Sequence, residues 1–493
     1  MPQGLRHGAS RRILVIFLTG VLLLKTYWLW HGAWGDPIAA MPLIVRQARM
    51  WQDFHSLLEQ HAPTGSPPLI ILGAGAQRFN PLSDSVRQNY IYNAVDLLQP
   101  MQEAHDGFVK AIQAPIDPAY VPRTKGIVSA AGGTYLPTFV VSLRMLRRTG
   151  STLPVELFLK DWGEYEPYIC GIVLPALNAQ CRVISAILVN QETEKGHAHK
   201  IEHYQIKSFA MLFSSFESFL WMDADCFPLH DPSILLNYKP FTSTGLVTWP
   251  DFWTNTMSPI YLNISRQPEL PTSARQATEA GVILVSKRSH FHTLLLSAYY
   301  NFHGPSWYYM LLNQESPGTG DKDTYLQAAT ALGAKFYAVS EPVADLGNRA
   351  GDGGVQGAAM LQADPIQDYD LTSRGKWRVR DPSVAKAPRG FFIHATNPEF
   401  NPGKQLMGEK SKKTDGTPGR LWTADESALR RFGYDAEKAY WEEAKTVACT
   451  LEHNFVTWRD KSGICQGMQE HWGAIFEDPD AEAPIFTTGL FWS

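Results

Sequence analysis

The chain has 493 residues, which is enough for one large domain with accessory segments or for several smaller domains. Hydrophobic residues make up 44% of the chain and charged residues 19%, which is ordinary for a folded globular protein. The formal net charge is -4, so the composition lacks the basic excess of a nucleic-acid-binding protein.

The amino end has the pattern of a membrane anchor. Several arginines precede an apolar run at residues 13–24, which is interrupted by Lys25 and resumes at residues 27–30. The two runs span about 18 residues, near the lower limit for a helix that crosses a bilayer, and the arginines favour a cytosolic tail. We therefore expect a cytosolic tail at 1–12 and a signal-anchor at 13–30. A cleaved signal peptide is the alternative, and both place the remaining chain in the lumen or outside the cell.

Composition divides the rest of the chain into segments. A Pro- and Gly-containing stretch at 61–68 indicates a linker, so we expect a stem at 31–68 and a helical extension at 69–121. Over 122–405, strands alternate with helices, which predicts a parallel sheet covered by helices. Strands are predicted at 126–130, 155–159, 183–188, 219–222, 282–285 and 391–393, and helices up to residue 148 and over 203–215. Residues 406–493 form a carboxyl-terminal extension to which no pattern assigns a role.

The five cysteines allow two short loops. Cys170 with Cys181 and Cys449 with Cys465 are close enough in sequence to pair, which would leave Cys226 as a free thiol. Disulfides would fit a lumenal chain, and five free thiols are the alternative.

Two carboxylates follow the strongest predicted strand. Residues 219–222 are apolar, and Asp223 and Asp225 come directly after them. Ligands of an open α/β sheet bind at the carboxyl ends of its strands. Oxygen ligands at that edge suit Mn²⁺ or Mg²⁺, which would bridge the phosphates of a nucleotide and neutralise the leaving group. Asp-x-Asp also occurs at 368–370 and 478–480, but only the first example follows such a strand, where a solvated loop is the alternative.

Other charged residues stand near predicted strand and helix ends. Lys207 lies off the apolar stripe of its helix, where it could contact a phosphate or simply face solvent. Glu279 precedes a strand and His394 ends one, where an imidazole can add a metal ligand, although a lone histidine is usually structural. Asp321 and Asp323 lead into a helix, and capping of that helix is the alternative to a role in a site.

An aromatic group, Trp249, Phe252 and Trp253, lies in a loop-like stretch. Aromatic rings stack on the C–H faces of sugars, so the group is a candidate acceptor platform, and core packing is the alternative.

The order of these motifs resembles the fungal Golgi α-1,3-mannosyltransferase family, whose members have the GT-A fold. The resemblance runs from about Lys125 to Lys404. Its matching stretches are Gly126-Ile-Val-Ser-Ala, His203-Tyr-Gln-Ile-Lys-Ser-Phe-Ala, Phe219-Leu-Trp-Met-Asp-Ala-Asp, Thr278-Glu-Ala-Gly, Gly320-Asp-Lys-Asp-Thr and Phe392-Ile-His-Ala-Thr-Asn. Ala280 replaces an expected Ser, and Asp323 stands where Glu is frequent, which leaves the acceptor preference open.

The resemblance implies an α/β fold of the GT-A type, with a Rossmann-like mixed sheet flanked by helices behind the anchor. It implies a single-pass type II protein of the Golgi membrane with a lumenal catalytic domain. It also implies GDP-mannose as donor, Mn²⁺ or Mg²⁺ as cofactor, and a glycan acceptor such as mannan or an N- or O-glycan, in protein glycosylation or in cell-wall or capsule synthesis. By position it makes Asp223, Asp225 and His394 metal ligands, Lys207, Asp223, Lys322 and Lys404 donor contacts, and Glu279, Asp321 and Asp323 neighbours of the transferred sugar.

Transfer from an α-linked donor to an α-linkage retains the anomeric configuration. Retention needs a carboxylate nucleophile, for which Glu279, Asp321 and Asp323 are the candidates, or a front-side route in which the departing phosphate acts as base. The sequence leaves both routes open.

Three other functions fit parts of the pattern. A related enzyme with a UDP-sugar donor would share every motif. A haloacid-dehalogenase-like phosphohydrolase also places Asp-x-Asp after a strand, but Phe227 stands where that pattern has Thr or Val. An inactive lumenal binding protein would keep the fold, although the intact Asp223 and Asp225 argue against it.

Overall fold

The computed structural model describes residues 41–188, 201–349, 355–396, 400–403 and 417–477. Among these residues, none of the helices combines the length and the apolar character that a bilayer-spanning segment needs. The expected anchor at 13–30 and Lys404 lie outside the described residues.

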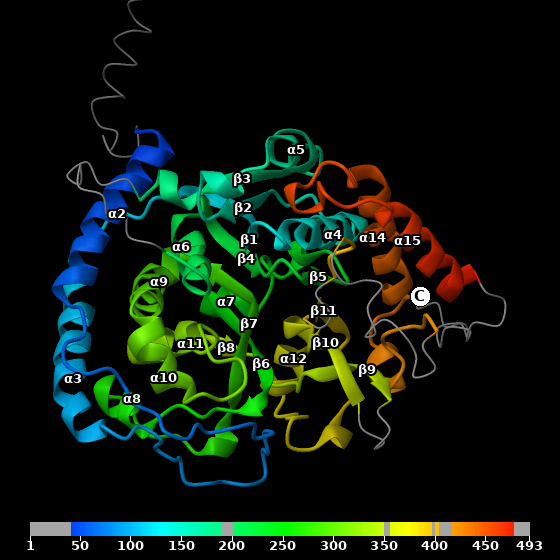
Figure 1. The fold of residues 1–493 in the computed structure, drawn as a ribbon. Coiled ribbons are helices and arrows are strands. Elements are labelled where there is room, and N and C mark those ends of the chain that lie inside the picture. Colours follow the sequence, from blue (N-terminus) through cyan, green and yellow to red (C-terminus); the bar gives the residue numbers. More distant parts are fainter. Residues whose placement is uncertain (1–40, 189–200, 350–354, 397–399, 404–416, 478–493) are drawn as a thin grey trace, which may run out of the picture.

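A seven-stranded sheet runs through the middle of the molecule (Figure 1). In spatial order its strands are β3 (Ala179–Val183), β2 (Val155–Leu159), β1 (Val121–Ala130), β4 (Phe216–Met222), β7 (Gln276–Ser286), β6 (Leu246–Thr254) and β8 (Tyr337–Ala338). The first four strands are parallel, whereas β7 runs antiparallel to both β4 and β6. The predicted parallel order therefore holds for one half, and β7 makes the sheet mixed, as the resemblance implied.

Successive side chains of a strand point to opposite faces, so each central strand contributes to two cores. Ile127 and Leu220 belong to one core, and their chain neighbours Val128 and Phe219 belong to the other. The covering helices are α4 (Tyr135–Arg148) and α14 (Ala436–Leu451) on the first face, and α6 (Gln205–Phe213) and α9 (Lys287–Phe302) on the second. Because these helices cover both faces of the sheet with apolar side chains, polar groups of a site are expected at the ends of the strands.

Two long helices flank the α9 side of the molecule, α2 (Leu43–Gln60) and α3 (Ala94–Ala111) (Figure 1). Much of the expected stem is therefore a packed helix. Trp51 and Phe54 are buried, and the rings of Trp51 and Phe209 meet edge to face with centroids 5.8 Å apart. Buried residues recur along α2 at helical spacing, and this periodicity identifies it as a core element.

A second sheet begins directly after the Asp-x-Asp segment. Its antiparallel strands are, in spatial order, β5 (Cys226–Pro228), β11 (Gly390–His394), β10 (Val355–Ala363) and β9 (Ala344–Arg349). His394 pairs in register with Cys226, so the end of β11 lies beside the end of the Asp-x-Asp segment. The remaining helices are α5 (Leu174–Ala176), α7 (Phe241–Thr244), α8 (Pro259–Ile264), α10 (Tyr309–Asn313), α11 (Thr324–Ala331), α12 (Pro365–Ser373), α13 (Glu426–Leu429) and α15 (Ile464–Trp472).

The two expected cysteine pairs are confirmed as disulfides, Cys170–Cys181 and Cys449–Cys465, and Cys226 is a buried free thiol. One strand prediction needs correction. The chain at 183–188 is mostly a short 3-10 turn, and the strand β3 lies before it. A run of apolar residues does not fix where an edge strand ends, because the turn is apolar too.

Candidate active site

A pocket of about 800 Å³ opens along the carboxyl ends of β1, β2 and β4 and continues past β7 to the loop before α11. Seven of the residues singled out in the sequence line it: Lys207, Asp223, Asp225, Glu279, Asp321, Lys322 and His394. The sheet thus brings together side chains that lie far apart in the sequence.

Lys207 is the buried cation of this pocket. Its side chain is 10% exposed, and Nζ lies 3.1 Å from Oδ1 of Asp223 and 3.2 Å from Oδ2 of Asp321. Nζ also donates to the carbonyl oxygen of Ala280 at 2.8 Å. Burial alone would lower the pKa of Lys207, but Asp223, Asp321 and Glu279 outweigh it and raise that pKa. The solvent-facing alternative for Lys207 is therefore wrong.

Asp223 has both carboxylate oxygens occupied. Nζ of Lys207 donates to Oδ2, and the indole Nε1 of Trp221 donates to Oδ1 at 2.7 Å. Burial raises the pKa of Asp223 against the opposing pull of Lys207 and His394. In this arrangement, Asp223 faces a cation of the protein, and its role as a metal ligand stays a prediction.

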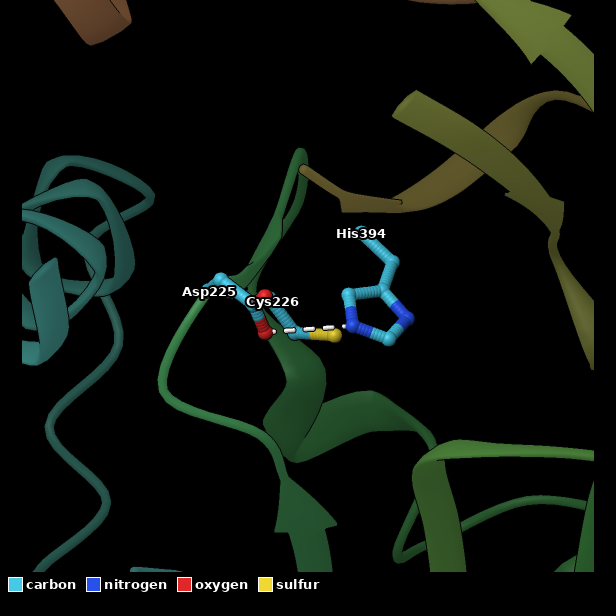
Figure 2. A group of neighbouring side chains, drawn as sticks. All are labelled: Asp225, Cys226 and His394. Carbon is cyan, nitrogen blue, oxygen red and sulfur yellow. Dashed lines mark ion pairs between the residues drawn. The ribbon is translucent and has the colours of Figure 1, made fainter. Parts of the chain in front are cut away.

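Asp225, Cys226 and His394 form a separate group (Figure 2). Nε2 of His394 lies 3.1 Å from Oδ1 of Asp225, and the ligand atoms of all three residues lie within 4.8 Å of one another. The pairing of β5 with β11 positions them, and the N–H of Ala395 donates to the carbonyl oxygen of Asp225 at 3.0 Å. Burial alone would lower the pKa of His394, but Cys226, Asp225 and Glu279 outweigh it and raise that pKa.

This group fits a divalent cation. Oδ1 of Asp225 and Nε2 of His394 lie 3.1 Å apart, so one ion could contact both atoms. A carboxylate oxygen and an imidazole nitrogen suit Mn²⁺, whereas the thiol of Cys226 is a softer ligand than Mn²⁺ or Mg²⁺ prefers. Asp225 and His394 are therefore the residues that would hold the ion.

Glu279 adjoins this group from β7. Its Oε1 accepts from Nδ1 of His394 at 3.1 Å and from the N–H of Gly281, whereas Oε2 is buried without a hydrogen-bond partner in the described part of the chain. Burial would raise the pKa of Glu279, but His394 and Lys207 outweigh it and lower that pKa, so the group is ionised. An ionised carboxylate with one unpartnered oxygen thus lines the pocket.

Gly281 makes this arrangement possible. A Cβ at that position would lie 2.6 Å from Nδ1 of His394 and 2.8 Å from Oε1 of Glu279. The β6–β7 pairing also shifts register here, since Trp249 pairs with Glu279 and Thr248 pairs with Ile283. Such bulges re-aim side chains at sites, and this one places the Glu279 carboxylate against the imidazole.

The neighbours Asp321 and Lys322 are both tied to partners. Oδ2 of Asp321 accepts from the hydroxyl of Tyr325 at 3.1 Å in addition to its contact with Lys207. Nζ of Lys322 lies 3.0 Å from Oδ2 of Asp251, and both side chains are buried. Lys322 lines the pocket as an ion pair with Asp251, which the sequence reading missed.

Asp323 does not reach the pocket, which corrects its expected place beside the sugar. Its Oδ1 accepts from the N–H of Thr278 at 3.1 Å and from Nδ2 of Asn255 at 3.2 Å, and the residue is 1% exposed. No side chain caps α11 at its amino end, so the capping alternative is wrong as well. Asp323 instead ties the start of α11 to β7.

The aromatic group is not an open platform. Trp249 is buried and meets Phe392 edge to face, as the core alternative proposed. The guanidinium of Arg78 lies 4.6 Å from the ring centroid of Phe252 and 4.9 Å from that of Trp253. Asp251, two residues after Trp249, is the functional candidate of this strand. Its signal in the sequence was a carboxylate within an otherwise apolar and aromatic run.

The chain is similar to fungal mannosyltransferases over most of its length. The Mannosyl_trans3 model, which describes mannosyltransferases, matches residues 124–278 and 270–364. Alpha-1,2-mannosyltransferase MNN21 of Candida albicans is 32% identical, over 80% of this chain and 69% of its own length. Alpha-1,2-mannosyltransferase MNN2 of Saccharomyces cerevisiae is 30% identical, over 73% and 70%. Among solved structures, the glycosyltransferase GlyE of Streptococcus pneumoniae has 11% identity and a TM-score of 0.34, over 66% of this chain and 63% of that chain.

The relatives define the class of the protein, which is a glycosyltransferase. The chain belongs to the Mannosyl_trans3 family of fungal mannosyltransferases. The expected family is therefore right, but the linkage in its expected name is corrected, because these relatives are named α-1,2 rather than α-1,3 enzymes. This membership overturns the phosphohydrolase alternative.

Proposed function

We propose that the protein transfers mannose from GDP-mannose to a mannose-containing glycan, forming an α-1,2 linkage with retention of configuration. The enzyme would use Mn²⁺ and work as a GT-A-type lumenal domain at the Golgi membrane. The observation that carries this proposal is the contact of Asp225 with His394 beside the ionised Glu279, in a pocket at the carboxyl edge of β4. The names of the relatives support the sugar and the linkage.

The residues divide the work by their contacts. Asp225 and His394 would hold the metal, which when bound would neutralise charge on the departing diphosphate. Lys207 adds a fixed positive charge on the Asp223 side of the pocket. Of the three carboxylates considered for contact with the sugar, Glu279 lines the pocket and keeps one buried oxygen without a hydrogen-bond partner among the described residues. Asp321 also lines the pocket, but its Oδ2 is held by Lys207 and Tyr325. Glu279 would therefore face the sugar, as nucleophile or as the stabiliser of an oxocarbenium-like state.

In the transfer, the bond from C1 of mannose to the phosphate oxygen breaks and a bond from C1 to the acceptor oxygen forms. The hydroxyl proton of the acceptor leaves to the diphosphate in the front-side route. In the two-step route, the carboxylate of Glu279 displaces the diphosphate from C1 to form a glycosyl ester. The acceptor oxygen then displaces Glu279 from C1, and the proton of the acceptor hydroxyl leaves to the diphosphate. Both routes need Glu279 ionised, and His394 and Lys207 favour this state by lowering the pKa of Glu279.

The donor half of the proposal can be tested by the melting temperature of the purified chain. We expect GDP or GDP-mannose to raise the melting temperature only with Mn²⁺, because bound ligands stabilise the folded state. The shift should vanish in Asp225→Asn and persist in Asp370→Asn, which alters an exposed Asp-x-Asp residue of α12 that pairs with Arg374.

Other results would separate the alternatives. A shift with UDP-sugars in place of GDP would keep the glycosyltransferase and remove the mannose donor. A folded protein that responds to no nucleotide would favour the inactive binding protein.

A further inference from the structure

The pocket has a second end that the catalytic groups do not use. Asp223 and Asp225 stand near its middle, at the end of β4, and Glu279 lies on the β7 side. On the opposite side, the ends of β1 and β2 contribute Gly132 and Glu164. If the proposed function holds, the diphosphate lies at β4 and the sugar beside Glu279. The base of the donor would then lie at the end of the pocket formed by β1 and β2.

Glu164 is the notable group at that end. It closes the 3-10 turn that follows β2, and it is half-buried. Its Oε2 accepts from the N–H of Lys160 at 2.7 Å, and Oε1 has no hydrogen-bond or ion-pair partner in the part of the chain that the structure describes. The nearby Lys160 ammonium pairs instead with Asp161, at 3.5 Å.

The fold makes room for this carboxylate. A Cβ on Gly132 would lie 2.2 Å from Cδ of Glu164 and 2.6 Å from its Oε1. Any other residue at position 132 would therefore displace the carboxylate. The turn after β1 and the turn after β2 therefore both lie close to the carboxylate of Glu164.

A carboxylate is an unfavourable neighbour for an anionic ligand unless the ligand offers it hydrogen-bond donors. A nucleoside diphosphate carries such donors only on its base and ribose. Guanine presents two adjacent donors, N1–H and the N2 amino group, which match the two oxygens of a carboxylate. Uracil flanks its single N–H with two carbonyl acceptors, and adenine and cytosine place a ring acceptor beside the amino group.

We propose that Glu164 is the specificity-determining residue for the donor base and selects guanine through N1–H and the N2 amino group. This proposal deepens the proposed function and rests on it. The contact from Lys160 occupies one acceptor position of Oε2, which leaves Oε1 and a second lone pair of Oε2 for a ligand in the pocket that Glu164 lines.

The hydrogen bond from the N–H of Lys160 also predicts how the amide of a glutamine at position 164 would be oriented. In Glu164→Gln, the N–H of Lys160 would hold the amide oxygen, which turns the amide NH₂ towards the pocket. A donor would then oppose the donors of guanine and match a carbonyl of uracil. Sites built to hydrogen-bond a ligand group discriminate strongly against its mismatch. We therefore expect the base preference to move from guanine towards uracil.

The test is calorimetric titration of the full chain with GDP, IDP and UDP in the presence of Mn²⁺. IDP is GDP without the N2 amino group, so the GDP-to-IDP affinity ratio isolates that contact. We expect the wild-type protein to bind GDP about tenfold more tightly than IDP. In Glu164→Gln, GDP affinity should fall about tenfold or more, the ratio should approach one, and UDP affinity should stay level or rise.

Two further variants make the test specific. Asp161→Asn removes a charge from the same turn but lies outside the pocket lining, so the GDP-to-IDP ratio should be unchanged. Gly132→Ala should lower the ratio by displacing the carboxylate, with little change in melting temperature because the added Cβ would meet only side-chain atoms of Glu164.

An unchanged ratio in Glu164→Gln would overturn the role of Glu164 and leave the proposed function standing. A folded wild-type chain that binds no nucleoside diphosphate, or binds only UDP, would instead overturn the proposed donor and this role together.

Discussion

Glu279 is ionised and buried, yet one of its carboxylate oxygens lacks a partner among the described residues. Buried polar atoms are nearly always hydrogen-bonded, and a catalytic role is one of the explanations for an exception. We expect Glu279→Gln to lower kcat by about 10²–10³-fold, because the sugar would lose its facing charge. The melting temperature should change little. Steady-state kinetics with a matched thermal scan measure both, and an unchanged kcat would remove Glu279 from the reaction.

Asp323 provides the contrasting case at the same scale. Its carboxylate serves Thr278 and Asn255 and does not line the pocket. Asp323→Ala should lower the free energy of unfolding by about 1–3 kcal/mol, because buried donors lose their acceptor. Activity per folded molecule should remain close to that of the wild type. A stable variant with a large loss of kcat would return Asp323 to the reacting groups.

The sequence could locate Asp225 and His394 because they occupy strand ends, whereas Glu279, which was expected before a strand, lies within β7. The resemblance assigned both of them to one metal site, and the structure sets Oδ1 of Asp225 and Nε2 of His394 3.1 Å apart. The sequence could not show that Asp223 accepts hydrogen bonds from Lys207 and Trp221. Helical periodicity predicts which face of a helix is buried, but not which residues that face contacts. Asp323 was misplaced because neighbours in a loop can point in different directions.

Among the elements, α14 and α15 stabilise the molecule from outside the pocket. The Cys449–Cys465 disulfide closes a loop with a sequence separation of 16 between these two helices. Replacing both cysteines by serine should lower the free energy of unfolding by about 3 kcal/mol, chiefly through the entropy of the unfolded chain. Affinity for GDP should not change, since neither helix lines the pocket. Denaturant titration and calorimetry test the two statements separately, and lost affinity in a folded variant would link these helices to the site.

Element prediction succeeded where burial and periodicity agreed. The helix ending at residue 148 and the strands β2 and β4 follow directly from apolar patterns. The antiparallel insertion of β7 and the register shift at Glu279 were beyond reach, because an apolar run does not reveal its partner or its direction. The packing of α2 was missed because the Pro- and Gly-containing stretch at 61–68 indicated a linker, so the residues before it were assigned to the stem.

At the scale of the whole molecule, Glu437 is a buried carboxylate within the carboxyl-terminal region. Its carboxylate accepts from the N–H groups of Leu421 and Trp422, and burial raises the pKa of Glu437 to about 7. A raised pKa means that the folded state binds more protons than the unfolded state between about pH 4.5 and pH 7. The contribution of Glu437 to the free energy of unfolding should therefore fall as pH rises through this window, by about 3 kcal/mol.

Glu437→Gln should remove that part of the pH dependence, as measured by the melting temperatures of the two proteins from pH 4.5 to pH 7. Lys287, whose pKa burial lowers to about 7, acts above this window and with the opposite sign. Parallel curves for wild type and variant below pH 7 would show that Glu437 does not couple this region to protons.

The most direct measurement is transfer itself. The purified chain would be incubated with GDP-mannose, Mn²⁺ and an α-mannoside acceptor, and the product analysed by mass spectrometry and by NMR of the new linkage. We expect one added hexose in an α-1,2 linkage, lost in Asp225→Asn and retained in Asp370→Asn. A folded wild-type protein that transfers no hexose from GDP-mannose to a range of α-mannosides, or an Asp225→Asn variant with full activity, would contradict the proposed mannosyltransferase site.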